Sequence, residues 1–337
     1  MAGICLGRTL TLSARRNIPM FTLKTFFPFG SVVAITVLLA SGLYTPKVDA
    51  VDAANPDQSE ETVAAVDDLL KLSGPYLGQQ VPGMTAELFA PGIVSVTGRY
   101  EFALSFAPGG DRLLFTVQTA DDKVLVLHSR QVEKQWTRPS PVNLSNGTRR
   151  DEMEAFFSPD GRQVYFAPYD GGMDVRIWQV TLDGDDWNNP APLTGAIAED
   201  PAFYPVMAND GTLYYINIKE RRPYFARQSE DGDWSAEPVP VEFGGHVYIE
   251  PDQSFLLLDA RAEDSLGGGD IYVAFPEKDG GWTKPVNLGP GVNSEHGESC
   301  PSLSADGKYL FFSRYDEEGG IAQIYWVDAG VIDQARP

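Results

Sequence analysis

Three glutamates stand at the same place in three copies of a repeated motif. Glu101, Glu152 and Glu298 each lie seven residues before the centre of a short turn rich in Pro, Asp and Gly. If the copies are arranged around an axis, residues at equal positions lie at equal height and radius. Three carboxylates would then surround one mouth of a central channel, and their repulsion would raise their pKa values unless cations or hydrogen-bond donors compensated. We therefore predict a ligand-binding site at this mouth.

Three further residues belong to the predicted site. His246 lies near the equivalent position of another copy, and Arg261 and Arg314 stand at matching positions after the second strand of their copies. The arginines are candidate partners for the glutamates, and where they do not neutralise them we expect a divalent cation or a cationic ligand to bind. In the alternative interpretation, each glutamate accepts hydrogen bonds from backbone amides of its neighbouring unit and has a structural role.

The sequence contains no set of residues typical of an established catalytic chemistry. It lacks the G-x-S-x-G motif of hydrolase nucleophiles. Its three histidines, His128, His246 and His296, lie in different repeats and match no zinc-ligand spacing. Cys300 begins a β-rich segment, which favours burial as a small apolar group over reactivity. We therefore assign no catalytic residue, no metal ligand and no cofactor other than the channel-mouth cation considered above.

The elements that position these residues follow from the repeat. Each copy consists of a strand, a tight turn, and a second strand rich in aromatic and aliphatic residues. Asp and Asn bind their own backbone in such turns, and Gly accepts a positive φ. The copies are SFAPGGDRLLF (105–115), FFSPDGRQVYF (156–166), VMANDGTLYYI (206–216), YIEPDQSFLLL (248–258) and SLSADGKYLFF (302–312), with turn centres at Pro108, Pro159, Asn209, Pro251 and Ala305.

A tryptophan follows four of the five turns at a similar distance. These residues are Trp136, Trp187, Trp234 and Trp282, each with a proline three or four residues later. A third β-rich segment lies between each turn and its tryptophan. Each unit therefore reads as four short antiparallel strands in a repeat of about 48 residues, a period typical of propeller blades. We expect the tryptophans to pack between units.

One such unit alone would expose sheet edges and apolar faces, so the units must pack against one another. Radial packing of four-stranded sheets gives an all-β fold, the β-propeller. The fifth unit lacks the tryptophan at this repeat position, because Asp333 stands where it is due. The segment AELFAPGIVSV (86–96) resembles the missing strand, so we predict that this N-terminal strand closes the ring. Residues 86–337 then fit five blades; six blades are the alternative, for which a sixth motif is lacking.

The motifs resemble a known repeat family. The phrases FSPDGR (157–162), SADGKYLFF (304–312), DIYV (270–273) and WTKP (282–285) are similar to the PD40 (WD40-like) repeat of TolB-type β-propellers. The resemblance covers residues 86–337. It implies a propeller fold and is less specific for function, since such repeats occur in periplasmic binding proteins and in the propeller domains of peptidases.

Residues 1–50 are interpreted as a signal peptide. A basic stretch precedes an apolar run (29–44) that is shorter than the roughly 20 apolar residues of a membrane span. Small residues predict cleavage after Ala50 or, slightly later, after Ala53, and an uncleaved anchor is the alternative. Translation starts at either Met1 or Met20, since the segment from Met20 is itself a complete signal.

Residues 51–85 are predicted to form a linker and a short helix. Ser59 is a candidate helix cap, and apolar residues recur at helical spacing from Val63 to Leu70. The helix is expected to end at the Gly74-Pro75 dipeptide.

The chain is strongly acidic, with 26 Lys and Arg against 47 Asp and Glu and a net charge of −21. Such a surface repels phosphate backbones and anionic lipid heads, which argues against nucleic-acid or membrane-surface partners. With the export signal, these features predict a periplasmic or secreted binding module for a protein or glycan of the cell envelope, with no stable membrane span after signal removal. The alternative is a glycan-active hydrolase or lyase using carboxylates at the channel mouth, about 5–10 Å apart.

Overall fold

A computed structural model describes residues 72–336 except 173 and 318–319. The chain divides into two compact units, Met1–Asn55 and Pro56–Pro337, and every described residue belongs to the second. The predicted signal peptide, its cleavage sites and the helix capped by Ser59 lie outside the described residues. Within the described part of the chain, no helix is both long and apolar enough to cross a membrane.

Five antiparallel sheets make up the fold, and each contains four strand positions. The outer position of blade 1 is shared by two short strands that both pair with β4. From the innermost strand outward, blade 1 is β2 (Tyr100–Phe106), β3 (Arg112–Gln118), β4 (Val124–Val132), and β5 (Gln135–Trp136) with β6 (Ser140–Pro141). Blade 2 is β7 (Asp151–Phe157), β8 (Gln163–Tyr169), β9 (Trp178–Asp183) and β10 (Asp186–Pro192).

The other three blades repeat this order. Blade 3 is β11 (Ala202–Met207), β12 (Leu213–Asn217), β13 (Arg222–Ala226) and β14 (Glu237–Pro238). Blade 4 is β15 (Val247–Ile249), β16 (Leu256–Ala260), β17 (Asp270–Ala274) and β18 (Val286–Asn287). Blade 5 is β19 (Glu298–Leu303), β20 (Tyr309–Glu317), β21 (Ile321–Asp328) and β1 (Glu87–Leu88). Helical structure is limited to η1 (Pro75–Gly78), η2 (Ala196–Ala198) and α2 (Gly330–Gln334) among the described residues.

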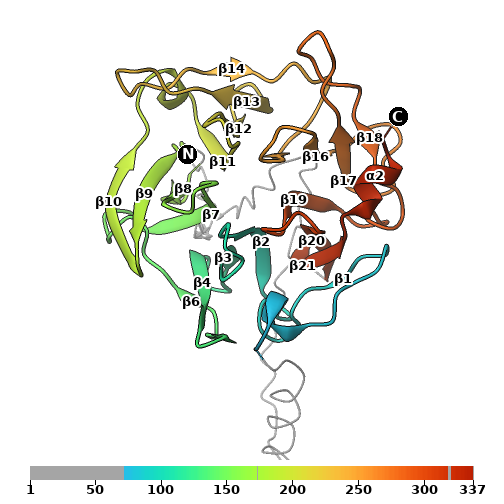
Figure 1. Cartoon of the computed structure of the whole chain (residues 1–337), viewed down its shortest axis with the longest axis horizontal. Helices are drawn as coiled ribbons and strands as arrows, with labels where there is room; N and C mark the ends of the chain where they lie inside the picture. The colour runs from blue at the N-terminus through green and yellow to red at the C-terminus, as the bar shows by residue number, and fades with distance from the viewer. Residues whose placement is uncertain (1–71, 173, 318–319, 337) are drawn as a thin grey trace, which may run out of the picture. The chain divides into compact units, whose positions relative to one another are not determined.

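The innermost strands form a closed ring. Strand β2 contacts β7, β7 contacts β11, β11 contacts β15, β15 contacts β19, and β19 contacts β2. Figure 1 shows the five sheets arranged in this order around a common centre. The chain is therefore a five-bladed β-propeller. The predicted all-β fold and blade count are confirmed, and the six-bladed alternative is wrong.

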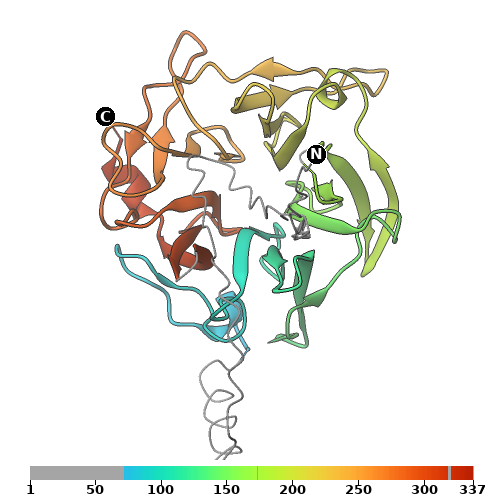
Figure 2. The same cartoon turned by 180° about the vertical axis from the view of Figure 1, so that it is seen from behind.

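The ring is closed by the N-terminal strand, as predicted. Strand β1 pairs antiparallel with β21, with Glu87 opposite Trp326 and Leu88 opposite Tyr325. Both views of the molecule place this segment, coloured cyan, beside the red C-terminal blade (Figures 1 and 2). Phe89, which takes the place of the missing tryptophan, is fully buried, and its ring centroid lies 4.9 Å from that of Phe311.

The residues just before β1 also pack on the propeller. The backbone N–H of Trp136 donates to Leu72 O at 2.6 Å, and its indole N–H donates to Gly74 O at 2.8 Å. Tyr76 donates to the Asp306 carboxylate at 2.7 Å, in the turn of blade 5. The segment from Leu72 therefore joins blade 1 to blade 5, and the part of residues 51–85 that the structure describes is not a free linker.

Four of the five innermost strands carry a β-bulge at the same place. The register shifts fall between Phe102 and Ser105, Met153 and Phe156, Phe203 and Val206, and Ser299 and Ser302. At each bulge one non-glycine residue has a left-handed backbone: Ala103 (φ 54°), Glu154 (φ 53°), Tyr204 (φ 59°) and Cys300 (φ 54°). A bulge of this kind bends the strand and changes the direction of a side chain.

The repeat tryptophans are buried to different degrees. Trp136 and Trp234 are 3% and 4% exposed, whereas Trp187 and Trp282 are only half-buried. The expectation that all four pack between blades therefore holds fully for two of them. Trp187, on β10 of blade 2, packs at the edge of a core cluster formed by blades 1 and 2, and its ring meets His128 of blade 1 edge-on at 5.8 Å.

Replacing Trp136 or Trp234 by alanine is expected to lower the free energy of unfolding by about 3–5 kcal/mol, because a fully buried aromatic side chain is lost. The same change at Trp187 or Trp282 is expected to cost only about 1–2 kcal/mol, since less apolar area leaves the protein interior. Urea denaturation of the four variants measures this directly. Equal losses at all four positions would contradict the burial described here.

Candidate functional site

The five residues that stand five positions before the turn centres converge at the centre of the ring. One comes from each blade, and all are buried: Ala103, Glu154, Tyr204, His246 and Cys300. Contacts between blades that are not neighbours establish the convergence. The Tyr204 hydroxyl of blade 3 donates to Pro301 O of blade 5 at 2.8 Å, and His246 Nε2 of blade 4 lies 3.7 Å from Glu154 Oε1 of blade 2. We call these five residues the axial ring.

Three members of the axial ring form a compact cluster of ligand-type atoms. One carboxylate oxygen of Glu154, one ring nitrogen of His246 and the Sγ of Cys300 all lie within 4.8 Å of one another. Each residue is less than 5% exposed. The Tyr204 and Phe203 rings cover the imidazole, with centroids 4.8 and 5.5 Å from its own.

Asp259, on β16, holds the cluster in place. Its Oδ1 accepts from the backbone N–H of His246 at 2.9 Å, and its Oδ2 lies 2.5 Å from His246 Nδ1. The same Oδ2 accepts from the backbone N–H of Cys300 at 3.1 Å. One buried carboxylate therefore joins blade 4 to blade 5. It also fixes the imidazole orientation, so that Nε2 faces Glu154.

A side chain of the neighbouring blade holds Glu154 in a similar way. Its backbone N–H donates to Thr116 Oγ1 of blade 1 at 2.8 Å. Thr116 and Asp259 occupy the same place on the second strands of their blades. Each therefore supplies a side-chain acceptor for the backbone of the next blade.

Burial and charge set the protonation of the cluster. Burial raises the pKa of Glu154 to about 7, against the opposing effects of His246 and of a backbone hydrogen bond from Tyr204. Burial disfavours charge on the imidazole, yet the Asp259 carboxylate holds the pKa of His246 well above its usual value. Burial also raises the pKa of the Cys300 thiol. The thiol is therefore not poised as an exposed nucleophile, in agreement with the burial predicted from sequence.

Two tyrosines lie close to the cluster. The hydroxyl groups of Tyr100 and Tyr315 are 2.7 Å apart, and Ser299 Oγ donates to the Tyr315 hydroxyl at 3.4 Å. Burial raises the pKa of both tyrosines, and both interact electrostatically with Cys300. Both phenols are therefore neutral near the buried thiol.

The three glutamates predicted at the channel mouth accept hydrogen bonds from backbone N–H groups of the loops before their strands. Glu101 Oε1 accepts from the backbone N–H of Val96 at 3.1 Å. Glu152 accepts from the backbone N–H groups of Leu144 and Ser145, at 2.8 and 2.6 Å. All three are buried at the start of an inner strand.

Glu298 completes the pattern. It accepts from Ser294 N at 3.2 Å and from Ser294 Oγ at 2.6 Å. Each glutamate thus fastens the loop that leads into its own inner strand. These hydrogen bonds are structural, as in the alternative interpretation, but they come from the loop before each strand. The role of the three carboxylates as ligands of a cation or of a cationic molecule stays a prediction.

Of the two arginines predicted as partners of the glutamates, one forms an ion pair and the other is exposed. Arg314 Nε donates to Glu298 Oε1 at 2.8 Å, so Arg314 is the partner that the sequence predicted. Arg261 is exposed after the end of β16. The arginine that meets Glu101 is Arg99, whose Nε lies 2.7 Å from Glu101 Oε1 and which the sequence reasoning missed. His246 lies with Glu154 and Asp259, two positions farther along the repeat than the three glutamates.

Glu152→Ala is expected to destabilise the protein by about 2–4 kcal/mol, because two buried backbone N–H groups lose their acceptors. Glu230→Ala serves as the control, since Glu230 is exposed in a hairpin turn and its loss should change stability by less than about 0.5 kcal/mol. Thermal and urea unfolding of both variants test the structural role of this glutamate. A Glu152→Ala protein as stable as the control would count against it.

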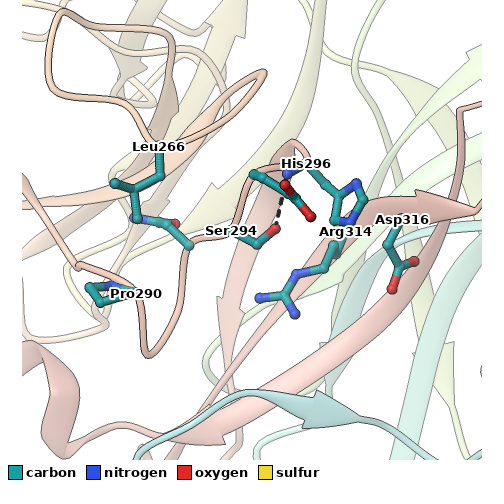
Figure 3. A pocket seen from close by; sticks show the side chains of 8 residues that line it. Leu266, Pro290, Ser294, His296, Arg314 and Asp316 are labelled. Carbon is teal, nitrogen blue, oxygen red and sulfur yellow. Dashed lines mark hydrogen bonds between the residues drawn. The ribbon is translucent and has the colours of Figure 1, made fainter.

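A polar groove lies on the surface where the loops of blades 4 and 5 meet. It has a volume of about 570 Å³ and is lined by Leu266, Pro290, Asn293, Ser294, Glu295, His296, Arg314 and Asp316. Figure 3 shows the side chains of His296, Arg314 and Asp316 around the same hollow, with Ser294 bonded to the backbone of His296. The Asp316 carboxylate accepts from the Tyr325 hydroxyl through Oδ2, and its Oδ1 is buried without a donor among the described residues.

Comparison with known proteins bears on the fold alone. No protein-family model matches this chain, and no curated protein matches it. Among solved structures, a protein assigned as TolB from Agrobacterium tumefaciens is 16% identical, covering 69% of this chain and 78% of its own, with a TM-score of 0.47. TolB from Acinetobacter baumannii is 15% identical over 67% of this chain and 54% of its own, with a TM-score of 0.41.

A third similar structure belongs to an enzyme. It is a thermostable family-43 glycoside hydrolase, 14% identical over 68% of this chain and 89% of its own, with a TM-score of 0.47. The neighbours therefore include TolB and glycoside hydrolase propellers, and at these identities they do not distinguish a binding protein from an enzyme.

Proposed function

We propose that this chain is an exported propeller that binds a protein or glycan partner in the cell envelope through the groove between blades 4 and 5. The groove is the observation that carries the proposal. Its volume of about 570 Å³ falls within the range of small-molecule and oligomer sites. It is also lined by both hydrogen-bond donors and hydrogen-bond acceptors.

The lining favours a partner that carries a carboxylate beside hydroxyl or amide groups. His296 and Arg314 supply donors, and Arg314, which pairs with Glu298 through Nε, places its guanidinium in the lining beside the carboxylates of Glu295 and Asp316. The Asp316 carboxylate, which accepts from the Tyr325 hydroxyl, supplies an acceptor to the lining. Uronate-containing glycans and acidic peptides both have this combination.

Export is supported by the sequence of residues 1–50. A basic stretch followed by a short apolar run and small residues at Val48 and Ala50 is typical of a cleaved signal peptide. Cell fractionation with N-terminal sequencing of the mature protein tests this part. A full-length protein found only in the cytoplasm would contradict it.

Binding is tested by calorimetric titration of the mature chain with uronate oligosaccharides and with acidic peptides. The variant His296→Ala/Asp316→Asn removes a donor and a charged acceptor while leaving Arg314 paired with Glu298. It should bind at least about tenfold more weakly, the loss expected for one or two hydrogen bonds involving charged groups. The control is Glu230→Ala/Asp231→Asn in an exposed turn, which should bind as the unmodified protein does.

The enzymatic alternative is tested in the same samples. A glycan hydrolase or lyase would release new reducing or unsaturated ends, and no release is expected here. If the protein cleaves a glycan and Glu101→Gln or Glu298→Gln abolishes the cleavage, the function is catalysis at the channel mouth and not binding in the groove. Equal binding by the groove variant and its control would show that the groove is not the binding site.

A further inference from the structure

The axial ring brings together a carboxylate, an imidazole and a thiol from three different blades. Glu154 lies on β7, His246 directly precedes β15, and Cys300 lies on β19. We propose that these three side chains bind one zinc-class divalent cation on the propeller axis. This site is separate from the surface groove and does not depend on the function proposed for it.

The spacing of the ligand atoms fits such an ion. Zinc bonds of about 2.0–2.3 Å in tetrahedral geometry place neighbouring ligand atoms about 3.4–3.8 Å apart. The distance between His246 Nε2 and Glu154 Oε1 is 3.7 Å, too long for a hydrogen bond and close to this value. The widest separation in the cluster is below 4.8 Å, so a shift of about 1 Å at most would bring all three atoms onto one ion.

A second observation points to a missing partner. Glu154 is 3% exposed, and its Oε2 accepts no hydrogen bond from any described residue. Leaving a buried carboxylate oxygen unsatisfied is costly. A cation coordinated by this carboxylate would remove that cost.

The surroundings of His246 match those of a metal-binding histidine. Histidines that bind metal usually donate their other ring nitrogen to a carboxylate, which fixes the tautomer and the ring orientation. The Oδ2 of Asp259 lies 2.5 Å from Nδ1 and leaves Nε2 facing the cluster. Asp259 also accepts from the backbone N–H of Cys300, so one carboxylate orients two of the three proposed ligands.

The chemical types of the three proposed ligands indicate which metal binds. A thiolate and an imidazole favour zinc and related transition metals, whereas calcium and magnesium favour sites made of oxygen ligands. The three protein ligands leave a fourth position for water. Because all three ligands are buried and come from blades 2, 4 and 5, we infer that the ion is structural and joins these blades at the axis.

The test uses the full chain and measures metal content, stability and spectrum. Purified protein should retain about one zinc per chain. After chelation, zinc at 100 times its Kd should raise the melting temperature by about 5–10 °C. Cobalt(II) should give the near-ultraviolet thiolate-to-metal absorption band, which reports Cys300 as a ligand. Calcium should give neither response.

Three variants separate metal binding from stability. Cys300→Ser should lose the cobalt band and Glu154→Gln should lose zinc retention, while Asp259→Asn should weaken zinc binding by about 10–100-fold. Asp270→Asn is the matched control, because Asp270 is a fully buried carboxylate of blade 4 outside the axial ring, and the variant should retain full zinc content.

Zinc bound equally by wild type and by Cys300→Ser, or no zinc retention and no cobalt band in folded wild type, would overturn the proposal. If the variants fail to fold, the cobalt spectrum of a chain carrying Cys5→Ser still decides, since Cys300 is then the one thiol that can produce the band.

Discussion

A chain that begins at Val96 will not form a stable ring, whereas one that begins at Leu72 will. The longer deletion removes β1, which pairs with β21, and uncovers the edge of blade 5. It also removes Leu77, Phe89 and Val94, which are fully buried in the core between blades 5 and 1. Circular dichroism and thermal melts of the two truncated chains measure the difference.

A point substitution tests the same closure of the ring without removing a strand. Phe89→Ala should lower the free energy of unfolding by about 3–5 kcal/mol, because Phe89 fills the space between Phe311 and Trp326. Val81→Ala, at a position 49% exposed in the same segment, should change it by less than about 0.5 kcal/mol. A cooperative melt at unchanged temperature for the chain starting at Val96 would show that the ring does not need its N-terminal strand.

Asp259→Ala should lower the free energy of unfolding by about 3–5 kcal/mol even without any metal. The substitution leaves the His246 imidazole without its buried counter-charge and two backbone N–H groups without their acceptor. Asp231→Ala is the control, since Asp231 is exposed in a turn. Urea denaturation with chelator present isolates this effect from metal binding. A loss below about 1 kcal/mol would contradict the role given to Asp259.

The fold could be predicted from the sequence because its signals are local and repeated. Each turn has its own Pro, Asp, Asn or Gly, and five copies of one motif fix the number of blades. Closure by β1 was also predictable, since Phe89 and Pro91 replace the tryptophan and proline missing from blade 5. The register of neighbouring strands is set within each hairpin, so the local sequence contains most of the information that determines the fold.

The axial ring was harder to predict because its members share a position but not a residue type. Glu101, Glu152 and Glu298 attracted attention as three identical residues, yet they bind neighbouring loops. The cluster lies two positions farther along, where each blade contributes a different side chain. Comparing all five copies at that position would have placed Glu154, His246 and Cys300 together on the axis.

Two further features depend on backbone geometry that the motif does not reveal. The left-handed residues in the bulges direct side chains to the axis, and the three bulge residues other than Ala103 have no glycine-like signature. The pairing of Arg99 with Glu101 depends on how the loop before β2 folds back. The spacing of residues along the sequence also could not reveal the proposed metal site, because its ligands come from three separate blades.

Anomalous diffraction from zinc-loaded crystals, collected on both sides of the zinc absorption edge, would locate the proposed ion. We expect one strong peak on the ring axis, within about 2.0–2.3 Å of Glu154, His246 Nε2 and Cys300 Sγ. A folded five-bladed ring with no peak at that place, or with zinc only on surface carboxylates, would contradict the proposed site.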